Sequence, residues 1–407
     1  MEQFPDLLKF RFNDSAYEYR VESFKAFLRA PPKKHKESPT TSDYVSISDE
    51  DLDRLLSQDA TETVVAGNYE SDISVIDGTV TAVSHDDVYF GDMRSAMETF
   101  PDIFRDLVYK EIGNDRMENL INAAWENGFF IKVPDSSRGL NISIVESSDR
   151  HSLSLKSVIL VGDDSSVDIT HSCYSNASPG SVHGKTVYLF IGKRSKVRFN
   201  YLQEKSKSIT DLTYVKSFLS DYAEFKIFHV NRGSEKVVFA NESIMRGEGS
   251  DFRTFGVSFT DGRQEMDIRD SSFQIGKNAY ADVQVRGAVS GESKTMHRGN
   301  IDIEEQSILS NGFYDSKILL LSEQGYANSK PALIIKNNNT KSKHGSAISS
   351  IDEDQILYLR SRGIDSDMAK SMITEGFLGY SMERSGNDML MKKVHDFAQA
   401  MMSDEKR

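Results

Sequence analysis

Cysteine is nearly absent from this chain of 407 residues, since Cys173 is the only one. A single cysteine excludes an internal disulfide framework, and it excludes a zinc or iron–sulfur site built from four thiolates of this chain. The sequence contains no run of about 18 apolar residues, and its start, MEQFPDLLKFRFND, lacks the basic and apolar stretches of a secretory signal. We therefore expect a cytoplasmic protein without a membrane partner.

Basic residues are also fewer than acidic ones. The 49 lysines and arginines are outnumbered by 62 aspartates and glutamates, which gives a formal net charge of −13. Binding to a phosphate backbone depends on clustered basic charge, so nucleic acid is not an expected partner. Hydrophobic residues make up 38% of the chain and aromatic residues 10%, which is enough for a sizeable core in two or three folding units.

The N-terminal part, residues 1–126, is predicted to be helical in its second half. The segment at about 30–53 gathers three of the eight prolines with charged and hydroxyl residues, and we interpret it as a flexible arm. Apolar residues recur at helical spacing over 92–127, with an interruption near Gly113. This pattern predicts two helices.

The middle part, residues 127–345, has a different residue pattern. Short runs of β-branched and aromatic residues alternate with Gly, Asp, Asn and Ser about every ten residues. This spacing predicts a large all-β core. It does not choose among a sandwich, a barrel and a solenoid.

Helical patterns return in the C-terminal part, residues 346–407. Ser350 and Glu353 form a capping-box pattern at the start of the first predicted helix, and Gly363 occupies the position of a C-terminal cap. A second helix is predicted to end at Gly376, and a third spans about 387–402. We expect a small helical domain after the β core.

The stretch from Gly180 to Thr186, GSVHGKT, resembles a phosphate-binding loop only superficially. That loop needs four residues between its glycines and a helix after its lysine, whereas three residues and a strand-like VYLFIG are present here. The chain also lacks a nucleophile elbow, a paired-histidine zinc helix and a dinucleotide-binding turn. No catalytic residue is assigned, and we expect that the protein is not an enzyme.

His171 and Cys173 lie two residues apart in a strand-like run, so their side chains point to one face of a sheet. This spacing places two potential metal ligands side by side. The alternative is a half-buried cysteine beside a surface histidine. The residues alone favour that alternative.

A set of short stretches occurs in order across roughly residues 125–380. The set comprises Asn127-Gly-Phe-Phe-Ile-Lys-Val-Pro134, Asp261-Gly-Arg-Gln264, Ile275-Gly-Lys-Asn278, His297-Arg-Gly299, and His344 followed by DEDQILYLRSRGID and AKSMITEGF. This ordered set resembles the SufB/SufD family, the scaffold proteins of the SUF iron–sulfur cluster assembly machinery.

The resemblance implies a mainly β fold, with a right-handed parallel β-helix core flanked by helical N- and C-terminal domains. It implies a SufC-type ABC ATPase as a partner, which docks on the C-terminal domain. It also implies a dimer, formed with a SufB-type paralogue or with a second copy of the chain. We expect the ATPase-docking face to include apolar residues of the first two tail helices: Ile356, Leu357, Leu359, Met368, Met372 and Ile373.

The resemblance also places two cluster-assembly candidates. Cys173 falls close to a SufB cysteine implicated in receiving sulfur, although the Gly and Pro that flank that cysteine are missing here. His344, in Lys341-Ser-Lys-His-Gly345, matches the histidine of a SufD pattern and becomes a candidate iron ligand, together with ligands from a partner chain. A second SufB cysteine falls near Ser316, and Gly345 stands where SufB proteins carry Glu. These departures favour a SufD-like assignment.

We therefore expect a non-catalytic scaffold subunit. The isolated chain is expected to hold no cofactor tightly, and a transient iron–sulfur cluster is expected at the dimer interface. Two alternatives from other classes stay open. A β-helix enzyme that acts on polysaccharides would need a cluster of acids with Lys or Arg in a long groove, and a purely architectural homodimer would have no ligand site.

Overall fold

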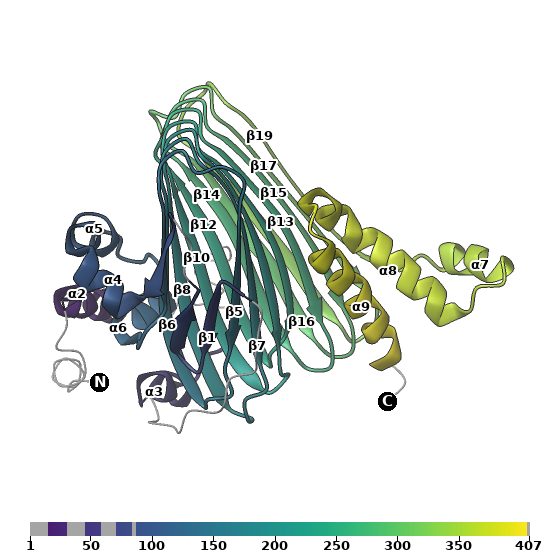
Figure 1. Ribbon diagram of the computed structural model, residues 1–407. Helices are drawn as coiled ribbons and strands as arrows, with labels where there is room; N and C mark the ends of the chain where they lie inside the picture. Colours follow the sequence, from purple (N-terminus) through teal and green to yellow (C-terminus); the bar gives the residue numbers. More distant parts are fainter. Residues whose placement is uncertain (1–14, 31–44, 58–70, 84–86, 405–407) are drawn as a thin grey trace.

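The computed structural model describes residues 15–30, 45–57, 71–83 and 87–404. Its centre is a solenoid of parallel strands, and helices from both ends of the chain pack on its sides (Figure 1). The prediction of a mainly β fold with a parallel β-helix core and helical flanks is confirmed. Within the described ranges, each helix is too short or too polar to cross a membrane.

Each coil of the solenoid contributes two strands, so alternate strands stack into two sheets. The first sheet contains the odd-numbered strands β5 (Leu140–Ser147), β7 (Ser166–Ser175), β9 (Lys196–Lys205), β11 (Glu224–Gly233), β13 (Asp251–Thr260), β15 (Tyr280–Val289), β17 (Asn311–Leu320) and β19 (Lys341–Ser350). The second sheet contains the even-numbered strands β4 (Phe129–Val133), β6 (Ser152–Val161), β8 (Ser181–Ile191), β10 (Ile209–Leu219), β12 (Lys236–Met245), β14 (Glu265–Gln274), β16 (Lys294–Ile303) and β18 (Tyr326–Ile335).

Three short N-terminal strands, which the sequence pattern does not predict, extend these sheets. They are β1 (Ile73–Ile76), β2 (Thr79–Ala82) and β3 (Tyr89–Asp92). Strand β1 pairs with β5, and β3 pairs with β4. The first coil therefore has neighbours on both sheets.

The parallel register arranges side chains in rows along the solenoid. Cys173, for example, is the register partner of Gln203, which is in turn the partner of Asn231. Because side chains alternate between the two faces of a strand, every second residue points into the interior, which we call the lumen. The largest buried apolar cluster of the molecule fills most of the lumen, from Ile73 at one end to Tyr314 near the other.

One corner of the coils repeats a residue in the left-handed backbone region. The amide of each such residue donates a hydrogen bond of 2.7–2.9 Å to a carbonyl of the following coil. These residues are Ser136, Asp164, Arg194, Tyr222, Gly249, Asn278 and Leu309. The repeated corner links neighbouring coils at the same position each time.

The N-terminal helices cover the outer face of the even-numbered sheet. They are α2 (Tyr17–Arg29), α3 (Asp49–Ser57), α4 (Met93–Thr99), α5 (Pro101–Asp106), the 3-10 turn η1 (Val108–Lys110) and α6 (Arg116–Ala124). Phe24, Leu55 and Leu120 from these helices belong to one buried cluster with Leu212 and Val238 of the sheet.

The C-terminal helices are α7 (Glu353–Ser361), α8 (Ser366–Met382), the 3-10 turn η2 (Glu383–Ser385) and α9 (Asp388–Asp404). Two of them, α8 and α9, pack against the opposite sheet, whereas α7 packs against α8 and projects from the solenoid (Figure 1). Leu378, Val394 and Phe397 pack against Phe255 and Phe259 on the outer face of β13. The tail therefore protects part of the solenoid from solvent.

The predicted arm at about 30–53 overlaps a helix. Residues 31–44 lie outside the described part of the chain, but Val45 is buried and α3 begins at Asp49. Leu52 and Leu55 of α3 are buried in the cluster beneath the N-terminal helices. The arm prediction is therefore wrong for 49–53, because a short apolar stripe among the charged residues packs onto the core.

Two predicted helix boundaries in the tail are also wrong. The second tail helix does not end at Gly376 but continues as α8 to Met382, because Leu378 and Met382 are buried against the solenoid and outweigh the low helix propensity of glycine. Ser350 is the last residue of β19, and Asp352 caps α7 instead by accepting a hydrogen bond of 2.9 Å from the amide of Asp354.

The break near Gly113 is present, since α6 begins after it at Arg116. The helix predicted before Gly113 is interrupted once more at Pro101, which occupies the first position of α5.

Candidate functional site

Cys173 and His171 both point into the lumen from β7, and both are fully buried. The sulfur Sγ of Cys173 lies 3.3 Å from Nε2 of His171. The prediction that their spacing places them on one face is confirmed. The alternative of a surface histidine is wrong, because the shared face is the inside of the solenoid.

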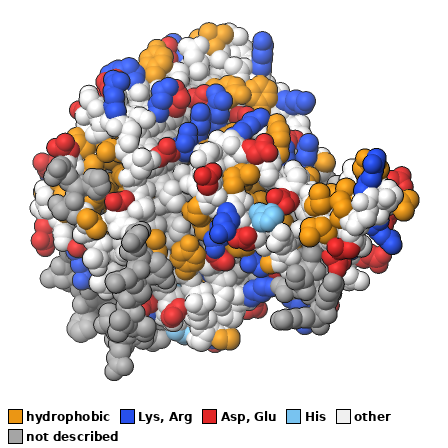
Figure 2. Space-filling model, turned by 45° about the vertical axis from the view of Figure 1, so that its right-hand side comes forward, with side chains coloured by type: hydrophobic (Ala, Val, Ile, Leu, Met, Phe, Trp, Pro, Cys, Tyr) orange, Lys and Arg blue, Asp and Glu red, His pale blue; other side chains and the backbone are white. Residues whose placement is uncertain are grey.

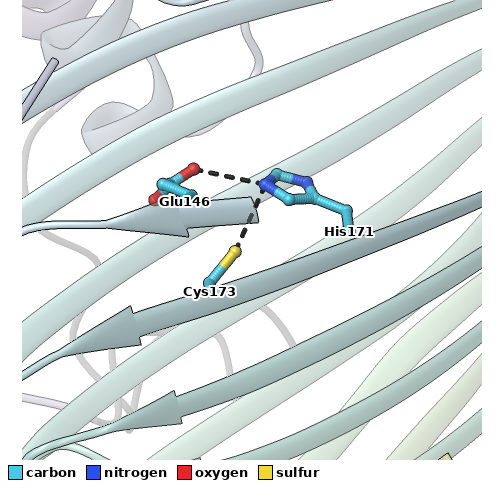
Figure 3. A group of neighbouring side chains, drawn as sticks. All are labelled: Glu146, His171 and Cys173. Carbon is cyan, nitrogen blue, oxygen red and sulfur yellow. Dashed lines mark hydrogen bonds and ion pairs between the residues drawn. The ribbon is translucent and has the colours of Figure 1, made fainter. Parts of the chain in front are cut away.

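Glu146 and Lys185 lie next to this pair. Glu146 on β5 is the register partner of Cys173, and its Oε2 lies 3.3 Å from Nε2 of His171 (Figure 3). Lys185, from β8, donates hydrogen bonds of 2.8 Å to Oε1 of Glu146 and to Sγ of Cys173. We call these four residues the lumen cluster.

The lumen cluster compensates its own charges. Burial raises the pKa of the Glu146 carboxyl, but the nearby Lys185 ammonium outweighs burial and holds that pKa well below its usual value. Burial and the Glu146 charge raise the pKa of the Cys173 thiol, whereas His171 and Lys185 lower it, and the net shift is downward. Burial lowers the pKa of Lys185, but the two anions hold it well above its usual value. Burial lowers the pKa of His171, but its contacts with Cys173 and Glu146 outweigh burial and raise that pKa. The contacts therefore favour the charged forms of Glu146 and Lys185, and they shift His171 and Cys173 towards their charged forms as well.

Aromatic rings separate the lumen cluster from solvent. The imidazole of His171 makes edge contacts with the rings of Phe129, Phe199 and Tyr201, at centroid distances of 5.4, 6.2 and 5.6 Å. Such a dry environment strengthens the electrostatic interactions within the cluster. It also means that the Cys173 thiolate has no direct route to bulk solvent in this conformation, because its exposed fraction is 0%.

A second polar group, the distal cluster, lies in the lumen nearer the C-terminal coils. It consists of His229, Ser258, Asp270, His297 and Ser316, all fully or almost fully buried. His297 contacts the hydroxyl of Ser258 at 2.8 Å through Nε2 and that of Ser316 at 3.2 Å through Nδ1, and Nε2 of His229 lies 3.3 Å from Oδ2 of Asp270. Burial lowers the pKa of His297 to about 3. The sequence does not reveal this cluster, because its members meet only when coils stack.

His344 lies far from Cys173. It is on β19, the last strand of the odd-numbered sheet, where its register partner is Tyr314. Six strand spacings separate β7 from β19, so these strands are about 29 Å apart at about 4.8 Å per strand. The two candidate residues are farther apart still, because the register row of Cys173 reaches β19 at Ile348 and not at His344. His344 is exposed to solvent, unlike the lumen residues of the preceding coils. The two cluster-assembly candidates therefore do not form one site.

The six apolar tail residues divide into two groups. Ile356 is buried, and Leu359 and Ile373 are half-buried between the tail helices. The other three are exposed by large fractions: Leu357 by 63%, Met368 by 48% and Met372 by 46%. Tyr358 and Tyr380, which the sequence analysis did not single out, are also exposed. Figure 2 shows hydrophobic side chains on the lobe formed by the C-terminal helices, which projects from the body of the molecule.

Comparison with known proteins adds independent information. Residues 144–377, more than half of the chain, match the family model described as "SUF system FeS cluster assembly, SufBD core domain". This region contains both clusters and His344. The chain is 22% identical over 336 residues to an "Iron-sulfur cluster assembly SufBD family protein" of Staphylococcus epidermidis, which covers 80% of this chain and 72% of that protein. It is 23% identical, with the same coverage, to "Iron-sulfur cluster assembly protein SufB" of Bacillus subtilis.

Proposed function

This chain belongs to the SufBD family of the SUF system for iron–sulfur cluster assembly, and from that premise we propose that it is a non-catalytic scaffold subunit. In this proposal it pairs with a SufB-type paralogue or with a second copy, and it binds a SufC-type ATPase through its tail. A transient iron–sulfur cluster forms at the interface between the paired chains. The SufD-like subtype is part of the proposal, since Ser316 and Gly345 replace the SufB cysteine and glutamate.

The observation that carries the proposal is the uncovered last coil. Strands β18 and β19 end the two sheets, so each has one neighbour within the described chain and a free edge. They also expose three large aliphatic side chains, Ile334, Ile335 and Ile348, by 39%, 40% and 43%. A free strand edge is a template for pairing with another chain. Pairing through this coil would cover both the edges and the apolar side chains.

His344 supports a cluster at that interface. It lies on the free strand β19, beside the side chains that pairing would cover. Imidazole is a competent iron ligand, and a partner chain would supply the thiolates that this chain lacks. Cys173 remains a second assembly candidate because its contacts lower the pKa of its thiol, but its distance from β19 excludes it as a ligand of the same cluster.

The tail supports ATPase docking. Leu357, Met368 and Met372 are exposed on helices whose other sides pack against the solenoid or one another. Exposed apolar side chains of this size, grouped on one lobe, are typical of a protein interface. Because α8 and α9 also cover an apolar part of the sheet, point substitutions test docking more cleanly than removal of the tail.

Co-expression of the full chain with a SufB-type paralogue and a SufC-type ATPase tests the proposal. We expect a complex that Ile348→Asp abolishes, because the charge would be buried in the paired coil. Leu28→Asp, at a residue of α2 that is 55% exposed, is the matched control and should assemble normally. Equal assembly of the two variants would contradict pairing through β19.

Two further variants test the ligand and docking roles. His344→Ala should fold and assemble normally but fail to support cluster maturation in a complementation assay, because an exposed side chain contributes little to folding. Met368→Asp combined with Met372→Asp should abolish ATPase capture without lowering the melting temperature. Full complementation by His344→Ala would exclude the ligand role. A dimer that neither captures the ATPase nor supports maturation would indicate a purely architectural protein.

A further inference from the structure

The lumen cluster contains three different metal-ligating atoms. Nε2 of His171, Sγ of Cys173 and a carboxylate oxygen of Glu146 all lie within 4.8 Å of one another, and Nε2 lies 3.3 Å from each of the other two. A tetrahedral ion with bonds of about 2.0–2.3 Å separates its ligands by about 3.3–3.6 Å. The two separations from Nε2 therefore match the edges of a tetrahedral coordination site, and the sulfur and the carboxylate oxygen lie within 4.8 Å of each other on the third edge.

The chemistry of the ligands selects the ion. A thiolate and an imidazole favour borderline or soft divalent ions such as Zn²⁺ and Fe²⁺, whereas Mg²⁺ and Ca²⁺ prefer sites made of oxygen alone. Three protein ligands leave a fourth position open, as in sites where a metal binds a further molecule.

Lys185 shows that the space between Glu146 and Cys173 accepts a positive charge. Its Nζ lies 2.8 Å from both the thiolate and the carboxylate, so the ammonium now provides the charge that a cation would provide. A divalent ion bound to Glu146 and Cys173 would repel the charged ammonium of Lys185 if the ammonium kept its present contacts with these two residues. Binding of the ion therefore displaces the Lys185 ammonium or releases its proton to solvent, and no oxidation or reduction is involved.

We propose that Glu146, His171 and Cys173 form a binding site for one divalent transition-metal ion, Zn²⁺ or Fe²⁺, inside the lumen, and that Lys185 competes with the ion. This inference rests on the contacts within the lumen cluster and not on the proposed pairing or ATPase docking. The site is separate from the proposed cluster position, because the strand of His344 lies about 29 Å from β7 at about 4.8 Å per strand.

Cobalt provides a direct probe of this site. Tag-free full-length chain, reduced and freed of metal with a chelator, would be titrated with Co²⁺ without oxygen, both after folding and during refolding. A thiolate-to-cobalt charge-transfer band identifies sulfur ligation, and Cys173 is the only cysteine, so the band reports this site alone. We expect one equivalent of Co²⁺ to produce the band, together with the visible bands of tetrahedral cobalt, and one equivalent of Zn²⁺ to remove both.

Variants separate a metal site from a purely structural ion-pair cluster. Cys173→Ala should abolish the charge-transfer band, and Glu146→Gln should weaken Co²⁺ binding at least tenfold. Lys185→Met should strengthen binding at least tenfold, because the competing ammonium is gone. Lys156→Met is the matched control: Lys156 is also fully buried, but it donates to Asn122, so the substitution should leave Co²⁺ binding unchanged.

Circular dichroism of each variant checks that it is folded before titration. The proposal would be overturned if neither the natural chain nor folded Lys185→Met produced the charge-transfer band in either loading protocol. It would also be overturned if the band persisted in Cys173→Ala, or if Lys185→Met bound Co²⁺ no more tightly than Lys156→Met.

Discussion

Replacing Lys185 with Met removes the ammonium that lies 2.8 Å from both Glu146 and Cys173. The side chains of Lys185 and Glu146 are only 4% and 6% exposed, so solvent cannot screen the charges that remain. Removing one partner of a buried ion pair typically costs about 3–5 kcal/mol in the free energy of unfolding, because the other charge is left without compensation. We expect a loss in this range for Lys185→Met.

An exposed ion pair provides the control. Lys196 and Glu224 form an ion pair with side chains that are 64% and 35% exposed. Lys196→Met should therefore cost less than about 1 kcal/mol. Combining Lys185→Met with Glu146→Gln should cost less than the sum of the two single substitutions, with a coupling of about 1–3 kcal/mol.

The penalty of Lys185→Met should depend on pH with a defined sign. In the natural chain the pKa of Glu146 is well below its usual value, so its contribution to stability is fully present above the unfolded carboxyl pKa and is lost as the pH falls. In the variant, burial without the ammonium raises the pKa values of Glu146 and Cys173. The folded variant then binds more protons than the unfolded chain, so its stability falls as the pH rises from 5 to 8.

Urea unfolding followed by far-UV circular dichroism at pH 5, 6, 7 and 8 measures these free energies. Reaction of the single thiol with a colorimetric reagent, before and after unfolding, confirms that Cys173 stays buried in each variant. A loss for Lys185→Met no greater than that for Lys196→Met would refute the assignment of a charge-compensated lumen cluster. A pH-independent difference from the natural chain would refute the ionised state of Glu146.

Two other predictions concern the solenoid itself. Because the pKa of His297 is lowered to about 3, its contribution to stability is fully present above the unfolded pKa of about 6.5 and is lost as the pH falls towards 3. His297→Gln should therefore reduce the slope of unfolding free energy against pH by about 1.4 kcal/mol per pH unit between pH 6 and 4. An unchanged slope would contradict a neutral buried imidazole. Gly233 has a φ of +87°, and an added Cβ would lie 1.8 Å from the carbonyl oxygen of Lys205. Gly233→Ala should therefore lower the melting temperature more than Gly262→Ala, where φ is +58° but the space is open, and equal effects would show that the backbone conformation alone determines the cost.

Local sequence patterns are sufficient to predict the β core and the helices on either side of it, but they do not predict β1, β2, β3 and α3. Alternating β-branched residues between turn residues are sufficient to predict strands, and apolar spacing is sufficient to predict the helices before and after them. The sequence contains no regular repeat that would identify the core as a solenoid. The partners of Cys173, Gln203 and Asn231, lie at separations of 30 and then 28 residues, and the residue types at these positions differ. Coil stacking requires matching backbone hydrogen bonds and side-chain volumes, not identical residues.

In the candidate site, too, one feature follows from local sequence and the others depend on the tertiary structure. The placement of His171 beside Cys173 follows from the two-residue period of a strand, which is a local property. The addition of Glu146 and Lys185, which are 39 residues apart, was decided only by the stacking of coils. The burial of His171 also depends on this stacking. Its Nε2 lies 3.3 Å from both Cys173 and Glu146, and the Lys185 ammonium lies 2.8 Å from those same two residues. Local sequence specifies the face of the strand on which a side chain lies, whereas only the stacking of coils determines which residues that side chain contacts.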